Sequence, residues 1–144
     1  MASQTQMPTY MGMTPGLNDQ GQIENIAARM KIVAKTAAYT VKDYESGTVF
    51  TNTGASGSVT FTLPTIATAL AGVYYYFFTV AAQNIVVASD PTDKLVVDNN
   101  ATADTLTSST SGHIIGAGLL VICDGTQWLT MQGGGSQVWV VADS

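Results

Sequence analysis

The chain has 144 residues, a length typical of one domain with a single core. Only 10% of the residues are charged and 46% are apolar, which excludes an intrinsically disordered composition. The net charge is −5 and four of the five basic residues lie between positions 29 and 42, which argues against a nucleic-acid-binding face. So few charges leave a monomer short of ionic surface, and burial against partners is one way to tolerate this.

Cysteine content and hydropathy limit the cellular compartments in which we expect the protein. The single cysteine, Cys123, allows no disulfide within the chain, which excludes a disulfide-stapled secreted scaffold. Residues 1–22 lack the basic start and apolar core of a signal peptide. The longest apolar stretch, at 73–80, is too short to cross a bilayer as a helix. We therefore expect a soluble protein, or one assembled into a soluble particle.

The first 21 residues differ from the rest of the chain. They contain prolines and glycines and follow neither a helical nor a strand period, yet apolar side chains are scattered through them: Met7, Tyr10, Met11, Met13 and Leu17. Flexible Met side chains suit irregular apolar contacts. The segment is either an extended arm that lies on a partner or a frayed terminus.

Residues 22–33 are the best helical candidate. Apolar residues share one helical face there, at positions 23, 26, 27 and 30. The segment can equally run into a strand at Ile32 and Val33. We take residues 1–35 as an N-terminal extended arm with a possible short helix.

From residue 36 onward the pattern is β. Thr, Val, Tyr and Phe dominate, and Gly, Asn, Asp or Ser interrupt them at the spacing of a sandwich or barrel. We expect strands at 38–42, 48–52, 58–63, 73–80, 85–88, 94–97, 118–123, 128–131 and 138–141. Residues 36–144 are thus predicted to form one mostly β domain: a single antiparallel β-sandwich or barrel, jelly-roll-like, behind the extended arm.

The strand patterns also indicate which faces are buried. Val59, Phe61 and Leu63 alternate with hydroxyl residues, so that strand has one apolar face. The segment VYYYFFTV at 73–80 is apolar on both faces. A fully buried central strand would have this pattern, and so would a strand with one face in the core and the other in a subunit interface.

Turn signals complete the pattern. Asp124-Gly125 supplies the positive φ angles that a tight hairpin between 118–123 and 128–131 needs. The polar segment 99–112 is expected to be a long loop, with at most a short strand near Leu106.

Few residues suit catalysis. The only histidine, His113, lies in a turn-like Ser-Gly-His context, where a structural role is more common than a catalytic one. Cys123 lies within an apolar strand, where an inert buried thiol is expected. The glycine-rich segment 54–57 lacks the lysine and following helix of a phosphate loop. We expect no enzymatic activity and no cofactor.

The sequence signals for a metal site or a sugar site are equally weak. No pair of residues has the usual zinc-ligand spacing. A loose acidic group surrounds segment 94–97, and it is either a calcium site or a set of solvated loop aspartates: Asp90, Asp93, Asp98 and Asp104. No EF-hand spacing accompanies it, so we expect no metal. Trp128 and Trp139 could stack on a sugar, but their apolar neighbours favour packing in a core or interface.

Several turn and core motifs together resemble small β-domains of tailed-phage virion proteins. SGTVFTNTGA at 46–55 and VTFTLP at 59–64 match a strand that ends in Asn-x-Gly-Ala and continues through a turn to a V-T-F-x-L-P strand. GVYYYF at 72–77 and AAQNIVV at 81–87 match the next two strands. A closing Val-x-x-Cys-Asp-Gly-x-x-Trp hairpin is matched by Val121, Asp124, Gly125 and Trp128, with the cysteine displaced to 123. The resemblance covers roughly residues 36–131.

Such domains occur in head decoration (cement) proteins and in tail-fibre or spike proteins, usually as trimers. The resemblance implies a virion structural protein and carries over no catalytic residue. The short chain, with one β-domain and an apolar-dotted arm, favours a capsid decoration protein that binds the outer surface of the expanded head and stabilises it. The alternative is a tail-fibre, spike or tail-accessory structural protein involved in host or glycan binding.

The first interpretation predicts specific contacts. The arm would bind the major capsid protein through Met7, Tyr10, Met11, Met13 and Leu17. A homotrimer would use Tyr74, Tyr76 and Phe78, and neighbouring decoration subunits would also be in contact. No nucleic acid or membrane is expected as a partner. The protein would be made in the host cytoplasm and lie on the outer capsid surface of the virion.

Overall fold

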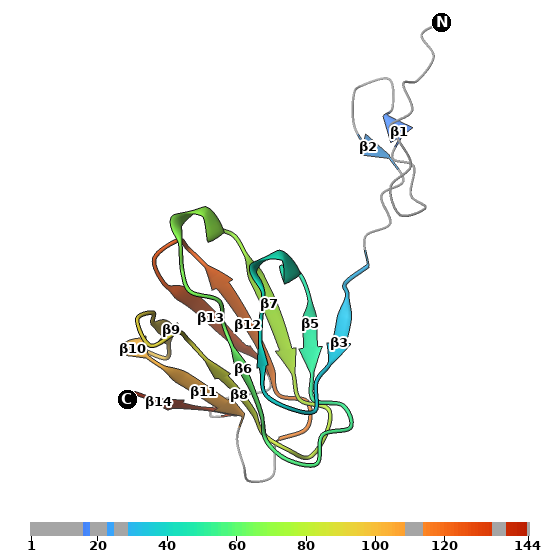
Figure 1. Ribbon diagram of the computed structural model, residues 1–144, viewed down its shortest axis with the longest axis vertical. Coiled ribbons are helices and arrows are strands. Elements are labelled where there is room, and N and C mark those ends of the chain that lie inside the picture. Colours follow the sequence, from blue (N-terminus) through green and yellow to red (C-terminus); the bar gives the residue numbers. More distant parts are fainter. Residues whose placement is uncertain (1–15, 18–22, 25–28, 109–113, 134–137, 144) are drawn as a thin grey trace, which may run out of the picture.

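The computed structural model describes residues 16–17, 23–24, 29–108, 114–133 and 138–143. Two β-sheets pack as a sandwich (Figure 1). The seven-stranded sheet has the order β10 (Asn100–Ala103), β9 (Leu95–Val97), β13 (Trp128–Gly133), β12 (Gly118–Cys123), β7 (Tyr74–Phe78), β5 (Val49–Thr51) and β3 (Ile32–Ala34). The five-stranded sheet has the order β14 (Trp139–Ala142), β11 (Thr105–Ser108), β8 (Ile85–Ala88), β6 (Val59–Thr62) and β4 (Tyr39–Thr40). The mostly β sandwich expected from the sequence is therefore confirmed.

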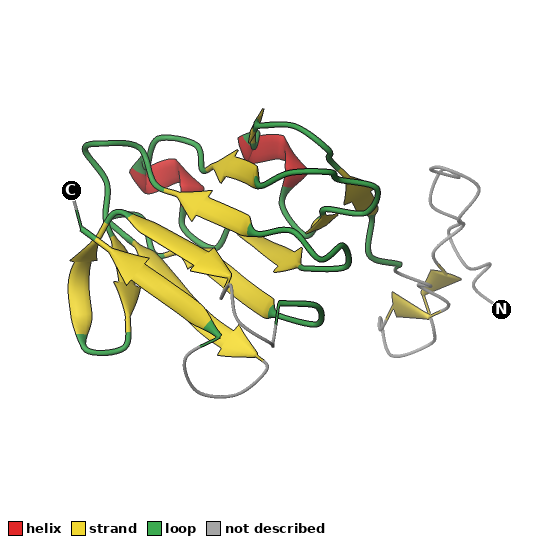
Figure 2. Ribbon diagram, turned by 90° about the horizontal axis from the view of Figure 1, so that it is seen from below, coloured by secondary structure: helices red, strands yellow, loops and turns green. Residues whose placement is uncertain are grey.

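Four small elements lie outside the two large sheets. Strands β1 (Gly16–Leu17) and β2 (Ile23–Glu24) pair with each other in a separate two-stranded sheet. The 3-10 helices η1 (Asp43–Glu45) and η2 (Thr68–Leu70) lie at the same end of the sandwich, and Figure 2 shows them in red beside the yellow strands. No helix among the described residues is long and apolar enough to cross a membrane.

Both sheets are mixed, which corrects the expectation of an antiparallel fold. Strands β3, β5 and β7 are parallel neighbours in one sheet, and β4, β6 and β8 are parallel neighbours in the other. The chain therefore changes sheet at each connection from β3 to β8, instead of returning as a hairpin within one sheet. Turn residues such as Gly54, with a φ of 82°, have the same composition in both kinds of connection. For this reason composition alone does not separate the two topologies.

The core lies between the sheets and is rich in aromatic rings. Phe50 and Phe77 come from the seven-stranded sheet and Phe61 from the other, and all three are fully buried. The centroid of the Phe61 ring lies 5.4 Å from that of Phe50 and 5.2 Å from that of Phe77. The expected alternation in β6 is confirmed, since Val59, Phe61 and Leu63 are buried while Thr60 and Thr62 between them are partly exposed.

Two local expectations were only partly right: the alternative strand at Ile32 and Val33 and the short strand near Leu106 are present. The helix expected at 22–33 is absent from its described part, because residues 23–24 and 32–34 are strands. A segment of this length makes only a marginal helix, and β-branched Ile32 and Val33 instead pair with β5 at the edge of the sheet. The sheet thus begins before the expected domain boundary at residue 36. The polar segment expected as a loop contains β10 and β11, because Leu106 and Ala103 turn into the core.

The turn between β12 and β13 is stabilised by one carboxylate. Asp124 Oδ1 accepts the backbone N–H groups of Thr126 and Gln127, both at 2.8 Å, and the Thr126 hydroxyl at 2.9 Å. Led by the Thr126 backbone bond, these contacts lower the pKa of Asp124 to about 2. Gly125, at a φ of 98°, has the positive φ that the sequence signal predicted, whereas Asp124 does not.

This pKa predicts how the turn responds to acid. Because the folded pKa lies below the ordinary value near 4, Asp124 stabilises the fold fully above that value, and the contribution disappears as the pH falls through about 2. The thermal midpoint of the wild type should exceed that of Asp124→Ala at neutral pH, and the gap should close between about pH 4 and pH 2. Carbon-13 NMR titration of the carboxylate measures the pKa directly. A midpoint near 4 would contradict the prediction.

Candidate interaction surface

The strands of the sandwich carry no charged side chains. Among the described residues, no strand of the seven-stranded or the five-stranded sheet contains Asp, Glu, Lys or Arg. The charges lie in turns, at strand ends and in the segments that flank the sheets. The outward faces of both sheets are therefore uncharged, although they border solvent.

The outer face of the seven-stranded sheet is also apolar. In β7 the buried residues Tyr75 and Phe77 alternate with outward-facing Tyr74, Tyr76 and Phe78. The other strands place large apolar side chains on the same face: Ile32, Val49, Leu120, Ile122, Leu129 and Met131. We call this set, together with the three β7 residues, the apolar face.

Strand register makes the apolar face continuous. The backbone pairs Ile32 with Val49, Val49 with Tyr76, Tyr76 with Leu120, and Leu120 with Met131. One row of apolar side chains thus crosses five strands. A second row runs from Tyr74 through Ile122 to Leu129. Directly opposed side chains in such rows lie about 5 Å apart, so they present one surface.

The apolar face is exposed and grooved. Ile32 exposes 70% of its surface, Met131 68%, and Phe78 46%. A groove of about 560 Å³ runs between Met131 and Phe78 and is lined almost wholly by apolar atoms. Gly118 forms part of it, and a Cβ there would lie 3.5 Å from the Phe78 ring, in ordinary contact.

The size of the exposed area points to a contact surface. With Met30, Tyr74 and Leu129, the exposed side chains present roughly 600 Å², taking about 200 Å² for a fully exposed large residue. That is at the upper end of what single-chain proteins leave open, and patches of this size usually mark interaction sites.

The opposite outer face has a different chemistry. The outward positions of the five-stranded sheet alternate threonines with small or β-branched residues: Thr40, Thr60, Thr62, Val86, Ala88, Thr105, Thr107, Val140 and Ala142. Threonine hydroxyls are well solvated, so this face needs no covering partner. The two faces of the sandwich are thus not equivalent.

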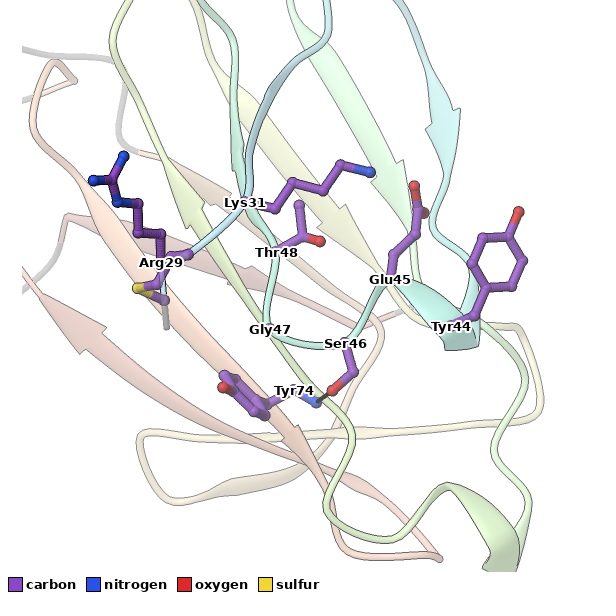
Figure 3. Close-up of a pocket in the computed structure, with 9 residues that line it drawn as sticks. Arg29, Lys31, Tyr44, Glu45, Ser46, Gly47, Thr48 and Tyr74 are labelled. Atoms are coloured by element: carbon purple, nitrogen blue, oxygen red, sulfur yellow. Dashed lines mark hydrogen bonds between the residues drawn. The ribbon is translucent and has the colours of Figure 1, made fainter. Parts of the chain in front are cut away.

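A smaller hollow of about 370 Å³ lies beside the turn at residues 46–48, between η1 and β5 (Figure 3). Arg29, Lys31 and the ring of Tyr74 contribute to its lining, and Tyr44, which is 83% exposed, stands at its rim. The Tyr74 backbone N–H donates to Ser46 Oγ at 3.2 Å, which fixes the turn against β7. Glu45 is already engaged, since its carboxylate accepts the Tyr39 hydroxyl and the Lys42 backbone N–H, both at 2.9 Å. The hollow therefore offers cations and aromatic rings.

Cys123, the one candidate catalytic residue among the described residues, is not activated. Burial raises the pKa of the Cys123 thiol, so the protein keeps it protonated and unreactive. Its sulfur accepts the Gly125 N–H at 3.3 Å, which is a structural role in the turn. His113 lies outside the described residues.

The acidic group is held by separate interactions. Asp90 accepts hydrogen bonds from Thr65 and Thr92, and Asp93 accepts the backbone N–H of Ile66. Asp104 pairs with Lys94. Across the described part of the chain, no three His, Cys, Asp or Glu side chains gather as metal ligands do.

The structure places the predicted contact residues as follows. Tyr74, Tyr76 and Phe78 lie together on the apolar face. Met7, Tyr10, Met11 and Met13 lie outside the described residues; Leu17 lies in β1, but its side chain is not described. Trp128 and Trp139 are both buried, so the packing interpretation of these residues is confirmed.

The apolar residues of β12 and β13 were missed by the sequence reasoning. Segment 118–123, GLLVIC, is apolar on both faces, as 73–80 is, and this was the signal that could have found them. The register that joins Leu120 and Met131 to the β7 residues required the structure. No family model matches the chain, and no curated protein matches its sequence.

Proposed function

We propose that this chain is a structural protein of a tailed-phage virion: a decoration (cement) protein that binds the outer surface of the expanded head and stabilises it. The observation that carries the proposal is the apolar face, an uncharged surface five strands wide on a small domain. Such a surface is suited to permanent contact with other subunits, and the described residues offer no activated catalytic group beside it.

The fold motifs give second support. The motif residues that resemble phage β-domains have clear structural roles: Asn52 holds the connection from β7 to β8, Gly54 takes the positive φ of a turn, Phe61 packs in the core, and Asp124 closes a hairpin. The resemblance therefore rests on residues that determine the domain, and the virion role follows from it by analogy.

Stabilisation of the head would follow from linkage. A protein that binds the expanded shell and not its ruptured state shifts the equilibrium toward the intact shell. In this proposal copies form a homotrimer with Tyr74, Tyr76 and Phe78 in the contact, because the exposed apolar area approaches the roughly 800 Å² per partner of a standard interface. The arm would bind the major capsid protein and neighbouring decoration subunits, with avidity from three copies.

Copy number tests the proposal most directly. Quantitative mass spectrometry of virions, against the major capsid protein, should give on the order of hundreds of copies, as repeated symmetric head sites require. A count of roughly three to a few tens would instead place the chain on the tail.

Removal of residues 1–21 tests the role of the arm. The shortened chain should still fold, because every strand of the sandwich lies between Ile32 and Ala142. Its affinity for expanded shells that lack the protein should fall at least about tenfold, since three weak arm contacts are lost together. A full-length control with the five apolar arm residues changed to serine separates side-chain chemistry from length. Wild-type binding by both variants would exclude an arm contact.

The alternative, a tail-fibre, spike or tail-accessory protein with glycan binding, has one observation in its favour. Tyr44 is 83% exposed beside the cationic hollow, and an open aromatic ring is suited to stacking on a sugar. A glycan array with wild type and Tyr44→Ala distinguishes the two: binding that depends on Tyr44 favours the tail protein.

A further inference from the structure

Charge is distributed unevenly across the sandwich. Strands β3 and β4 form one pair of sheet edges, and β10 and β14 form the opposite pair (Figure 1). Four of the five basic residues flank the first pair: Arg29, Lys31, Lys35 and Lys42. With Asp43 and Glu45 they give residues 29–45 a net charge of four minus two, or +2. We call this side the basic edge.

The opposite side carries two exposed carboxylates. Asp98 lies in the turn between β9 and β10, and Asp143 directly follows β14, so one belongs to each sheet. Both are exposed, and together they contribute −2. We call this side the acidic edge.

Among the described residues, no side chain of opposite charge forms an ion pair with the charges named on the two edges. The Asp98 carboxylate accepts the Gln132 side-chain amide at 2.7 Å, and Asp143 accepts the Asn100 amide at 3.0 Å. Both donors are neutral. The single ion pair in the described part of the chain is Lys94 with Asp104, and neither residue belongs to the basic edge or the acidic edge.

The cations of the basic edge form no ion pair with any described carboxylate. The Lys35 ammonium lies 3.6 Å from the centroid of the Tyr39 ring, and Lys31 lines the hollow of Figure 3 with Arg29. Glu45 is occupied by the Tyr39 hydroxyl and a backbone N–H. Both edges are therefore charged surfaces that an external group can neutralise.

The strands at both charged edges are open to pairing with another copy of the chain. Each of β3, β4, β10 and β14 pairs on one side only, which leaves backbone donors and acceptors open on the other. Like charges on both edges of a sheet protect against pairing between copies, because any two edges then repel. Opposite charges on the two edges do the reverse: the basic edge of one copy attracts the acidic edge of another.

We propose that copies of this chain associate head to tail, with the basic edge of one copy against the acidic edge of the next. The contact uses a different surface on each partner, so it closes into a ring when the rotation allows. In a ring of copies that meet edge to edge, the same sheet face of every copy can turn toward the rotation axis. The apolar faces then meet at the centre of the ring. This inference rests on the self-association in the proposed function and adds which surfaces meet.

Neutralising variants test the edges without reversing any charge. Lys31→Gln/Lys42→Gln removes two cations from exposed positions, and Asp98→Asn/Asp143→Asn removes two anions while keeping side chains of the same shape. Asparagine tolerates the positive φ of 44° at position 98. Sedimentation velocity of the full chain at about 0.02 M and 0.5 M salt measures association, because salt shortens the range of these charges. We expect each variant to associate roughly tenfold more weakly than wild type at low salt, and wild type to weaken similarly at high salt.

Matched controls separate the edges from net charge. Ala67 and Ala69 are exposed beside η2, which lies against the turn of the central strands β12 and β13, far from either edge in strand order. Ala67→Glu/Ala69→Glu changes the net charge by −2, as the lysine variant does, and Ala67→Lys/Ala69→Lys changes it by +2. Both controls should associate like wild type.

Mixing the two edge variants supplies the sharpest result. The lysine variant keeps its acidic edge, and the aspartate variant keeps its basic edge. One contact between oppositely charged edges therefore remains possible between the two variants. The mixture should form pairs at wild-type strength and nothing larger, although each variant alone is weak. The proposal is overturned if the variants associate like wild type, if the controls weaken equally, if the mixture shows no rescue, or if wild type is monomeric at low salt. Copy number on the virion, measured separately, decides the proposed function whatever the outcome here.

Discussion

Replacement of Asn52 by alanine should destabilise the chain by about 3 kcal/mol or more, although the change removes few atoms. Asn52 is fully buried at the end of β5. Its Oδ1 accepts the backbone N–H groups of Val80 and Ala81 at 2.8 and 2.9 Å, and its Nδ2 donates to the carbonyl oxygen of Gln83 at 2.7 Å. One amide thus satisfies several backbone groups of the connection from β7 to β8.

The size of the effect follows from what the truncation leaves behind. Alanine leaves these partly buried donors and acceptors without the Asn52 amide, and several such losses of about 1 kcal/mol or more each add to the expected total. Asn52→Asp should also destabilise strongly at neutral pH, because a carboxylate would face the carbonyl oxygens that now accept from the amide.

Urea unfolding of the variants measures the free energy directly. Asn100→Ala is the matched control, since its amide bonds only exposed groups of Asp143 and Thr102 and its loss should cost less than about 1 kcal/mol. An Asn52→Ala variant within that same range would show that the connection is held by other contacts.

The buried role of Asn52 also shows how far the sequence could predict the fold. The Asn-x-Gly-Ala motif was recognised as a turn pattern, but the partners of Asn52 lie 28 to 31 residues away. Strand positions and buried faces were predictable where the alternation was clean, as in Val59, Phe61 and Leu63. Local pattern carries this information because side chains alternate along any strand.

Topology and register were not predictable in the same way. Parallel neighbours such as β5 and β7 arise from connections that change sheet, and their turns use the same glycines as hairpins do. The interaction surface depends on these features. Tyr74, Tyr76 and Phe78 were identified as an outward face, whereas Leu120 and Met131 join them only through the pairing of three strands. The separation of Asp98 from Lys31 on opposite edges likewise follows from strand order.

Two adjacent phenylalanines in β7 allow the core and the apolar face to be tested with the same truncation. Phe77 is fully buried, with its ring centroid 5.8 Å from that of Phe50 and 5.2 Å from that of Phe61. Phe77→Ala should therefore cost about 3–5 kcal/mol in free energy of unfolding. Phe78 is 46% exposed and its ring lies over Gly118. Phe78→Ala should cost less than about 1 kcal/mol in the isolated chain.

The two substitutions should affect self-association in the opposite order, with the larger effect at Phe78. The proposed trimer has a mass near 45 kDa, three times the 15.0 kDa chain, and light scattering detects its loss. We expect Phe78→Ala to weaken self-association at least about tenfold, because an exposed aromatic anchor in an apolar face is typical of residues that dominate an interface. Phe77→Ala, assayed where it remains folded, should associate nearly as wild type does, since its ring points away from the apolar face. Equal association by Phe78→Ala and wild type would remove the apolar face from the subunit contact, and a stable Phe77→Ala would contradict the sandwich core. The period of two along a single strand thus separates what holds the domain together from what joins its copies.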